Sequence, residues 1–253
     1  PGQRHADIPE NHPAVANVCF NPVKYACLSS DAINFFSHPA NAEPDGLLAI
    51  GGDLSPRRLL LAYRMGIFPW YSKGLPILWW SPDPRLALFP DELRVSHSLR
   101  RTLRKRQFHV TFDRAFAEVM RQCALVRREK GEDTWILPEM IRAYTRLHEL
   151  GYCHSVESWS DGELVGGLYG VALGSAFFGE SMFARKSDAS KVAFVHMVRL
   201  LESMRFQLID CQVTTSHLKS LGAREVARSE FLSRLSKAVV EDAGHCGSWH
   251  DKV

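Results

Sequence analysis

The sequence predicts a mixed α/β fold with a largely antiparallel sheet, and the C-terminal half supplies the observations. Three strand-like segments follow one another with short glycine-containing turns between them: 154–159, 161–173 and 174–183. A segment with apolar residues at helical spacing, 188–204, comes next, and the strand-like segment 206–213 follows it. Strands joined by tight turns pair antiparallel, whereas a strand reached through a helix requires a crossover. We therefore expect a mixed sheet with a helix packed on it.

The N-terminal part carries less regular signals. Residues 1–36 are polar and rich in Pro, Asn and His, so we expect a poorly ordered extension there. Ser55 followed by Pro56 is a typical helix start, and Gly66 can end that helix. Residues 67–84 are rich in proline and include three tryptophans. This density of proline predicts an ordered loop, held down by aromatic side chains, rather than a helix or a strand.

Helices and one strand are expected in the middle of the chain and at its end. Residues 94–106 predict a basic helix, residues 108–112 a short strand, and Asp113 the N-cap of the next helix. Further helices are expected at 138–151 and after an N-cap at Ser229. We accordingly divide the chain into four parts: an extension (1–36), an N-terminal domain (37–93), a C-terminal α/β domain (94–240) and a tail (241–253).

Composition excludes several classes of protein. With 45% hydrophobic and 23% charged residues, the chain is neither disordered nor a coiled coil. No apolar run approaches the length of a transmembrane helix, and residues 1–20 lack the apolar core of a signal peptide. Six cysteines without a CxxC pair predict reduced thiols, a cytoplasmic location and no metal site. We also expect a monomer, because no uncommitted apolar stripe is evident.

Polar residues interrupt two of the predicted strands. Asp210 and Gln212 are two positions apart, so their side chains should share a face; Phe178, Glu180 and Met182 should do the same. If these strands are neighbours, two carboxylates and an amide converge beside apolar side chains. Charged groups inside apolar strands cost free energy unless they are paired or used. The pattern therefore indicates either a functional site or a structural hydrogen-bond network.

The basic segment 94–106 offers a second candidate site, although the net charge of the whole chain is only +3. No acidic residue occurs from Leu93 through Phe112, which favours a phosphate-binding surface. The alternative is an ordinary solvated helix face. P-loop, nucleophile-elbow, HExxH and GxGxxG motifs are all missing from the sequence. The basic residues of the segment are Arg94, Arg100, Arg101, Arg104, Lys105 and Arg106.

Five motifs resemble the leucyl/phenylalanyl-tRNA–protein transferase family and together cover roughly residues 42–236. They are DGLLAIGGDLSPRRLLLAYRMGIFPWYSKGLPILWWSPDPRLAL, EDTWI, HELGYCHSVESW, LVGGLYGVALGSAFFGESMF and LIDCQV. The resemblance implies a small N-terminal domain followed by a GNAT-like C-terminal domain. It also implies transfer of Leu or Phe, and less well Met, from tRNA to proteins that begin with Arg or Lys. Such transfer marks proteins for degradation in the N-degron pathway and uses no metal or organic cofactor.

The same resemblance assigns roles to individual residues. Asp210 and Gln212 match the family's catalytic pair, Glu180 its substrate-contacting glutamate, and Trp70 and Trp135 the tryptophans that engage the terminal adenosine. The six basic residues of 94–106 would then hold tRNA phosphates. For Phe194, Met197 and Leu201, which lie on the predicted helix, the alternative to a pocket role is ordinary helix core. The tail after about residue 238 does not match the family. The family's apolar amino-acid pocket falls at Leu168, Met182, Phe194, Met197, Leu201 and Ile209.

The chemistry of the reaction constrains the roles of Asp210 and Gln212. The donor is an activated ester, and about a tenth of an α-amine with a pKa near 8 is unprotonated at neutral pH. Positioning can then supply much of the acceleration. A carboxyl with an ordinary pKa near 3.9 is a poor base for an ammonium group, so we favour Asp210 as an orienting charge.

Three alternatives stay open: Asp210 as the base, an acetyl-CoA-dependent acetyltransferase, and a non-catalytic tRNA-binding module.

Overall fold

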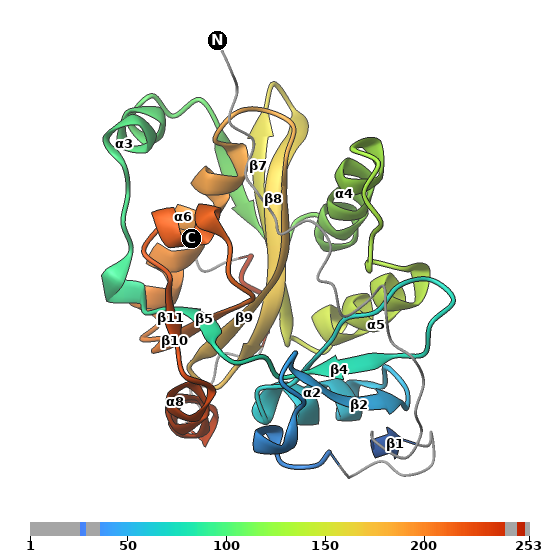
Figure 1. The fold of residues 1–253 in the computed structure, drawn as a ribbon. Coiled ribbons are helices and arrows are strands. Elements are labelled where there is room, and N and C mark those ends of the chain that lie inside the picture. Colours follow the sequence, from blue (N-terminus) through green and yellow to red (C-terminus); the bar gives the residue numbers. More distant parts are fainter. Residues whose placement is uncertain (1–25, 29–35, 241–246, 251–253) are drawn as a thin grey trace.

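The fold contains two sheets joined through the chain that links β4 to β5 (Figure 1). The computed structural model describes residues 26–28, 36–240 and 247–250. The smaller sheet has the order β1-β2-β4-β3 and the larger one the order β11-β5-β10-β9-β8-β7-β6. The smaller sheet and α2 lie at one end of the larger sheet, beside α5 and α8.

The smaller sheet is built by the N-terminal part of the chain. Its elements are β1 (Ala26–Leu28), η1 (Pro39–Asn41), β2 (Leu47–Gly51), α2 (Pro56–Arg64), β3 (Phe68–Pro69) and β4 (Leu78–Trp80). As predicted, Ser55 is the N-cap of α2: its hydroxyl accepts from the amide of Arg58 at 3.4 Å. The predicted loop at 67–84 is wrong in part, because β3 and β4 pair antiparallel within it. The proline-rich strand β3 is only two residues long and lies at the sheet edge, where a proline costs no ladder hydrogen bond.

The larger sheet confirms the predicted mixed, largely antiparallel architecture. Its strands are β5 (Arg85–Leu88), β6 (His109–Phe112), β7 (Cys153–Ser160), β8 (Glu163–Leu173), β9 (Ala176–Ala184), β10 (Leu208–Gln212) and β11 (Arg224–Val226). Among these described strands only β9 and β10 pair in parallel, because the helix α6 carries the chain between them.

Two of the expected boundaries differ from the structure. β1 lies inside the expected extension 1–36 and pairs with β2, while most of that extension lies outside the described residues. β5 lies inside the expected N-terminal domain 37–93 but pairs with β10 and β11 of the larger sheet. The chain therefore passes from the smaller sheet to the larger sheet before Arg85, and not after residue 93 as expected. Pro82 and Pro84 directly precede β5, and this proline density led to the prediction of a loop up to residue 84.

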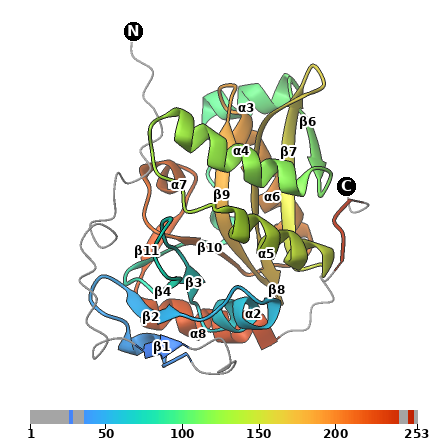
Figure 2. The same ribbon diagram turned by 90° about the vertical axis from the view of Figure 1, so that its right-hand side faces the viewer.

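Helices cover both faces of the larger sheet (Figures 1 and 2). The helices of this part of the chain are η2 (Pro90–Glu92), α3 (His97–Arg104), α4 (Phe116–Glu129), α5 (Pro138–Glu149), α6 (Ala189–Ser203), α7 (Ser216–Ser220) and α8 (Arg228–Val240). α6 packs on one face, and α4 and α5 pack on the other. Each face has its own apolar core. No helix in the described ranges is long and apolar enough to cross a membrane.

Two helix starts differ from the sequence prediction. Asp113 does not cap α4, whose N-cap is Ala115; the Asp113 carboxylate instead accepts hydrogen bonds from β7. Ser229 lies within α8, which begins one residue earlier at Arg228, whose amide donates to the Asp83 carboxylate at 3.0 Å. At the start of α4 the Ala115 amide donates to the Glu157 carboxylate at 3.3 Å. At both helix starts a carboxylate distant in sequence thus accepts from the backbone, and sequence spacing carries no signal for such a contact.

Candidate active site

A cavity of about 910 Å³ lies beside the ends of β9 and β10 and the N-terminal half of α6. One part of its wall is apolar, and the residues predicted from the sequence that line it are Leu168, Met182, Phe194, Met197 and Ile209. Glu180 and Gln212 add polar groups, and Trp70 and Trp135 add aromatic rings. The structure therefore brings together nine of the predicted site residues around one hollow.

Glu180 is the polar centre of this cavity. Its Oε1 accepts hydrogen bonds from the Tyr63 hydroxyl and the Gln212 side-chain amide, both at 2.8 Å. The Tyr63 hydroxyl is also hydrogen-bonded to that of Tyr144, so α2, α5 and β10 all contribute to the surroundings of this carboxylate. Burial raises the pKa of Glu180 to about 7, although the bonds from Tyr63 and Gln212 oppose the increase. Glu180 can therefore change its charge near neutral pH.

A bulge in β9 aims Glu180 at this position. Tyr169 of β8 pairs with Ser181 and Gly170 pairs with Gly179, which leaves Glu180 as the extra residue. The bulge also corrects the prediction that Phe178, Glu180 and Met182 share a face. Phe178 belongs to the core beneath α4 and α5, whereas Met182 packs against the core beneath α6. Gly170 permits the close approach of the two strands, because a Cβ there would collide with the carbonyl oxygen of Phe178.

Asp210 lies behind the cavity rather than in its wall, which differs from the predicted arrangement. Its side chain is fully buried, and both carboxylate oxygens are held by the Arg85 guanidinium, at 2.8 Å from Nε and 2.6 Å from Nη2. Oδ1 also accepts from the backbone amide of Gln212 at 2.9 Å. A register shift lies between Asp210 and Gln212, and Gln212 has φ of 61°, so strict strand alternation does not operate here. Asp210 therefore acts on the cavity from behind: it fixes the Gln212 backbone, and its charge helps to raise the pKa of Glu180.

Sequence reasoning missed Arg85. Its guanidinium is buried between the rings of Phe68 and Phe231, with 4.7 Å from Cζ to each ring centroid. The signal that could have found it is Asp210 itself, because a buried carboxylate requires a cationic partner. Tyr63 and Tyr144 were also missed as site residues, since their helical spacing indicates only core positions.

The two tryptophans form an aromatic edge of the cavity. Trp70 follows β3 and Trp135 precedes α5, and their ring centroids are 5.8 Å apart with the planes at 76°. The Arg127 guanidinium lies over the Trp135 ring, 4.3 Å from its centroid. Leu201, in contrast, does not line the cavity; it is fully buried in the core beneath α6. For this one position the ordinary helix-core interpretation describes the structure.

The six basic residues predicted to bind tRNA are all exposed on and around α3. Arg100, Arg104 and Arg106 line a second hollow of about 580 Å³, to which α6 contributes His196 and Arg199. α3 is tied to the start of α6 by a hydrogen bond of 3.1 Å from the Thr102 hydroxyl to Asp188. A surface of positive charge therefore continues from α3 onto α6.

Sequence comparison decides the family. The family described as "Leucyl/phenylalanyl-tRNA protein transferase" matches residues 87–236, and its N-terminal domain matches residues 52–83. The chain belongs to this family. A leucyl/phenylalanyl-tRNA–protein transferase from Syntrophobacter fumaroxidans is 68% identical over 208 residues, covering 82% of this chain and 88% of the relative. Another, from Nitrosospira multiformis, is 61% identical over 212 residues, covering 84% and 91%.

Membership of the leucyl/phenylalanyl-tRNA–protein transferase family makes the chain an enzyme of the aminoacyltransferase class, as the motifs predicted. Among solved structures, a GCN5-related N-acetyltransferase from Kribbella flavida has a TM-score of 0.35 at 13% identity, covering 68% of this chain and 61% of that one. The strand order of the larger sheet, β11-β5-β10-β9-β8-β7-β6, defines the fold.

Proposed function

We propose that the protein transfers Leu or Phe, and less well Met, from aminoacyl-tRNA to the N-terminal α-amine of proteins that begin with Arg or Lys. The product carries a new peptide bond and is marked for degradation by the N-degron pathway, in the cytoplasm, with the enzyme acting as a monomer. The observation that carries this proposal is the large cavity whose wall is apolar on one side and presents Glu180 and Gln212 on the other.

The apolar wall suits the donor side chain. Leu168, Phe194 and Met197 offer no buried polar partner, so a charged or polar amino acid would lose its hydration without compensation. A thioether side chain adapts to more than one shape, which fits acceptance of both Leu and Phe. Pocket contacts of this kind discriminate weakly, by about 1–3 kcal/mol per methylene.

Glu180 suits the acceptor. A protein that begins with Arg or Lys carries two positive charges near the attacking nitrogen, and a cavity carboxylate complements them. The charge of Asp210 is already compensated by Arg85, so Glu180 is left as the negative group closest to Gln212. An acceptor cation beside Glu180 would also favour the ionised form of this carboxylate.

The reaction does not require a covalent intermediate with the protein. The α-amine attacks the ester carbonyl, the C–N bond forms, the C–O bond to the tRNA ribose breaks, and the amine proton leaves with the ribose hydroxyl or to solvent. Because the ester is already activated, this chemistry needs no metal or organic cofactor. Gln212 would hold the reacting groups by hydrogen bonds, and Asp210 would fix the Gln212 backbone; the occupation of both Asp210 oxygens by Arg85 supports an orienting role over a role as the base.

The rest of the tRNA would extend from the aromatic edge. Trp70 and Trp135 offer ring faces and edges at the cavity, which suits the terminal adenosine. The positive surface on α3 suits phosphates, which are bound without reading sequence. We propose the same six basic residues, Arg94, Arg100, Arg101, Arg104, Lys105 and Arg106, as tRNA contacts.

The deciding experiment mixes the protein with Leu-tRNA or Phe-tRNA carrying a labelled amino acid and with peptides that begin with Arg, Lys or Ala. We expect the label on the Arg and Lys peptides and not on the Ala peptide. A parallel reaction with labelled acetyl-CoA tests the acetyltransferase alternative. Label from acetyl-CoA alone would replace the proposal, and tRNA binding without any transfer would leave only a tRNA-binding module.

A further inference from the structure

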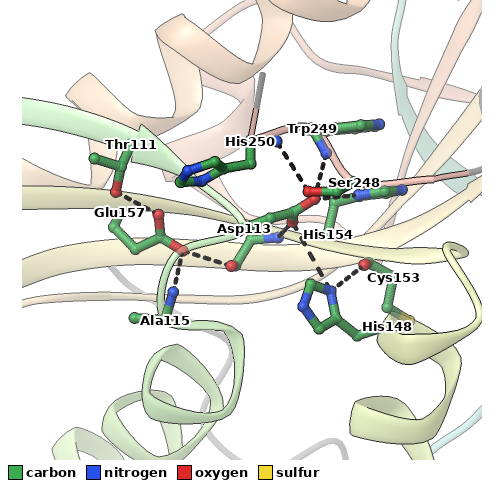
Figure 3. A network of polar contacts seen from close by, with 11 residues as sticks. Thr111, Asp113, Ala115, His148, Cys153, His154, Glu157, Ser248, Trp249 and His250 are labelled. Carbon is green, nitrogen blue, oxygen red and sulfur yellow. Dashed lines mark hydrogen bonds and ion pairs between the residues drawn. The ribbon is translucent and has the colours of Figure 1, made fainter. Parts of the chain in front are cut away.

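Residues 247–250 lie against the larger sheet, and their contacts with it centre on Asp113 (Figure 3). Trp249 is completely buried, and its backbone amide donates to Asp113 Oδ2 at 2.7 Å. The amide of Gly247 donates to the carbonyl oxygen of Gly151 at 3.3 Å. The segment is therefore held at two points: at Asp113, between β6 and α4, and at Gly151, between α5 and β7.

Asp113 is the anchor of this segment (Figure 3). Its carboxylate also accepts from the Ser155 amide and from the His154 ring, both at 2.9 Å. Burial raises the pKa of Asp113, but the hydrogen bonds from His154, Trp249 and Ser155 outweigh it and lower the net value. The His154 ring in turn stacks on the Trp249 indole, with centroids 3.8 Å apart and planes at 3°. The hydrogen bond from the Trp249 amide to the Asp113 carboxylate and the stacking of the indole on His154 together fix the position of this side chain.

The indole also contacts a ring that lines the candidate active site. The Trp249 and Phe177 ring centroids are 5.9 Å apart, and Phe177 lines the large cavity next to Ile209. Trp249 and Phe177 belong to the same apolar core as Phe194 and Met197 of α6. Trp249 does not itself line the cavity. It is the layer of packing behind one wall.

We propose that Trp249 determines which donor amino acid is accepted, by fixing the Phe177 ring and so the depth of the apolar cavity. This inference rests on the proposed function, because it assigns the donor side chain to that cavity. Closely packed interiors pass a change in volume to neighbouring side chains. Removing the indole leaves space into which Phe177 can turn, and the cavity then deepens on the side that faces the donor.

The test compares wild type with Trp249→Ala in transfer from Leu-tRNA and Phe-tRNA to an Arg-initiated peptide. We expect kcat/KM for Phe relative to Leu to rise by roughly tenfold, the discrimination that one methylene group provides in a pocket. Trp249→Leu keeps an apolar filler, is the milder change should the alanine variant fail to fold, and should raise the ratio by a smaller factor.

Leu147→Ala is the matched control for loss of stability. Leu147 is equally buried but lies on α5, on the opposite face of the sheet, and does not line the cavity. It should lower Tm and leave the Phe-to-Leu ratio unchanged. An unchanged ratio in both Trp249 variants overturns the inference. If wild type transfers neither amino acid, the proposed function itself fails, and the two failures are therefore distinguishable.

Discussion

The Arg85 guanidinium holds both carboxylate oxygens of Asp210 in a pair from which water is excluded, with side chains that are 1% and 0% exposed. This pair joins β5 to β10 and stands directly behind Gln212, whose amide bonds to the same carboxylate. The candidate active site is thus supported by a charge pair whose members come from positions 125 residues apart.

Arg85→Met should destabilise the protein strongly, because it leaves Asp210 buried without a counter-charge. We expect the free energy of unfolding to fall by about 3–5 kcal/mol, measured by urea titration. Arg224→Met removes an exposed ion pair with Glu92 and a cation–π contact with Phe89, and should cost no more than about 2 kcal/mol. Equal small losses in both variants would mean that the buried pair does not organise this part of the sheet.

Asp210→Asn should lose transfer activity that high pH does not restore. The substitution removes the charge that Arg85 binds and sets an amide NH2 against the guanidinium, so the position of Gln212 is disturbed while the acceptor amine is unaffected. The measurement is kcat/KM for peptide between pH 7 and 9.5, with wild type alongside. Full recovery at high pH would show instead that Asp210 accepts the proton of the amine.

Glu180 should make stability depend on pH in a defined direction. Its folded pKa of about 7 lies above its ordinary value of about 4.3, so between these values the folded state binds more protons than the unfolded state. The contribution is complete below pH 4.3 and is lost as pH rises through 7, with a slope of at most about 1.4 kcal/mol per pH unit. Urea titrations from pH 5 to 8 should show this fall in wild type and a flatter profile in Glu180→Gln. The same steep fall in the variant would remove Glu180 as its cause.

Replacing Arg100 and Arg104 with Gln should weaken binding of charged tRNA. Both guanidinium groups line the hollow between α3 and α6, and removing each phosphate-binding cation should reduce the slope of log K against log salt by about one. Arg146→Gln on α5 changes an exposed arginine on the opposite face of the sheet and is the control. Unchanged affinity and salt dependence in the double variant would remove α3 from the tRNA-binding surface.

Regular elements of this fold follow from local patterns, and the exceptions have physical causes. Apolar spacing predicts α5 and α6, and turn residues separate β7, β8 and β9. The bulge at Glu180 and the positive φ of Gln212 break the two-residue repeat, so the face of each side chain could not be predicted. Arg85 and Trp249 act through contacts with residues far away in sequence, and no local pattern marks such contacts.

The central claim is that the donor amino acid occupies the cavity between the α6 face and Gln212. A crystal structure with a non-hydrolysable 3′-phenylalanyl-adenosine analogue tests it most directly. We expect the phenyl ring against Phe194 and Met197, the carbonyl within hydrogen-bond distance of Gln212, and the adenine at Trp70 or Trp135. An analogue seated elsewhere, with this cavity empty, would contradict the claim.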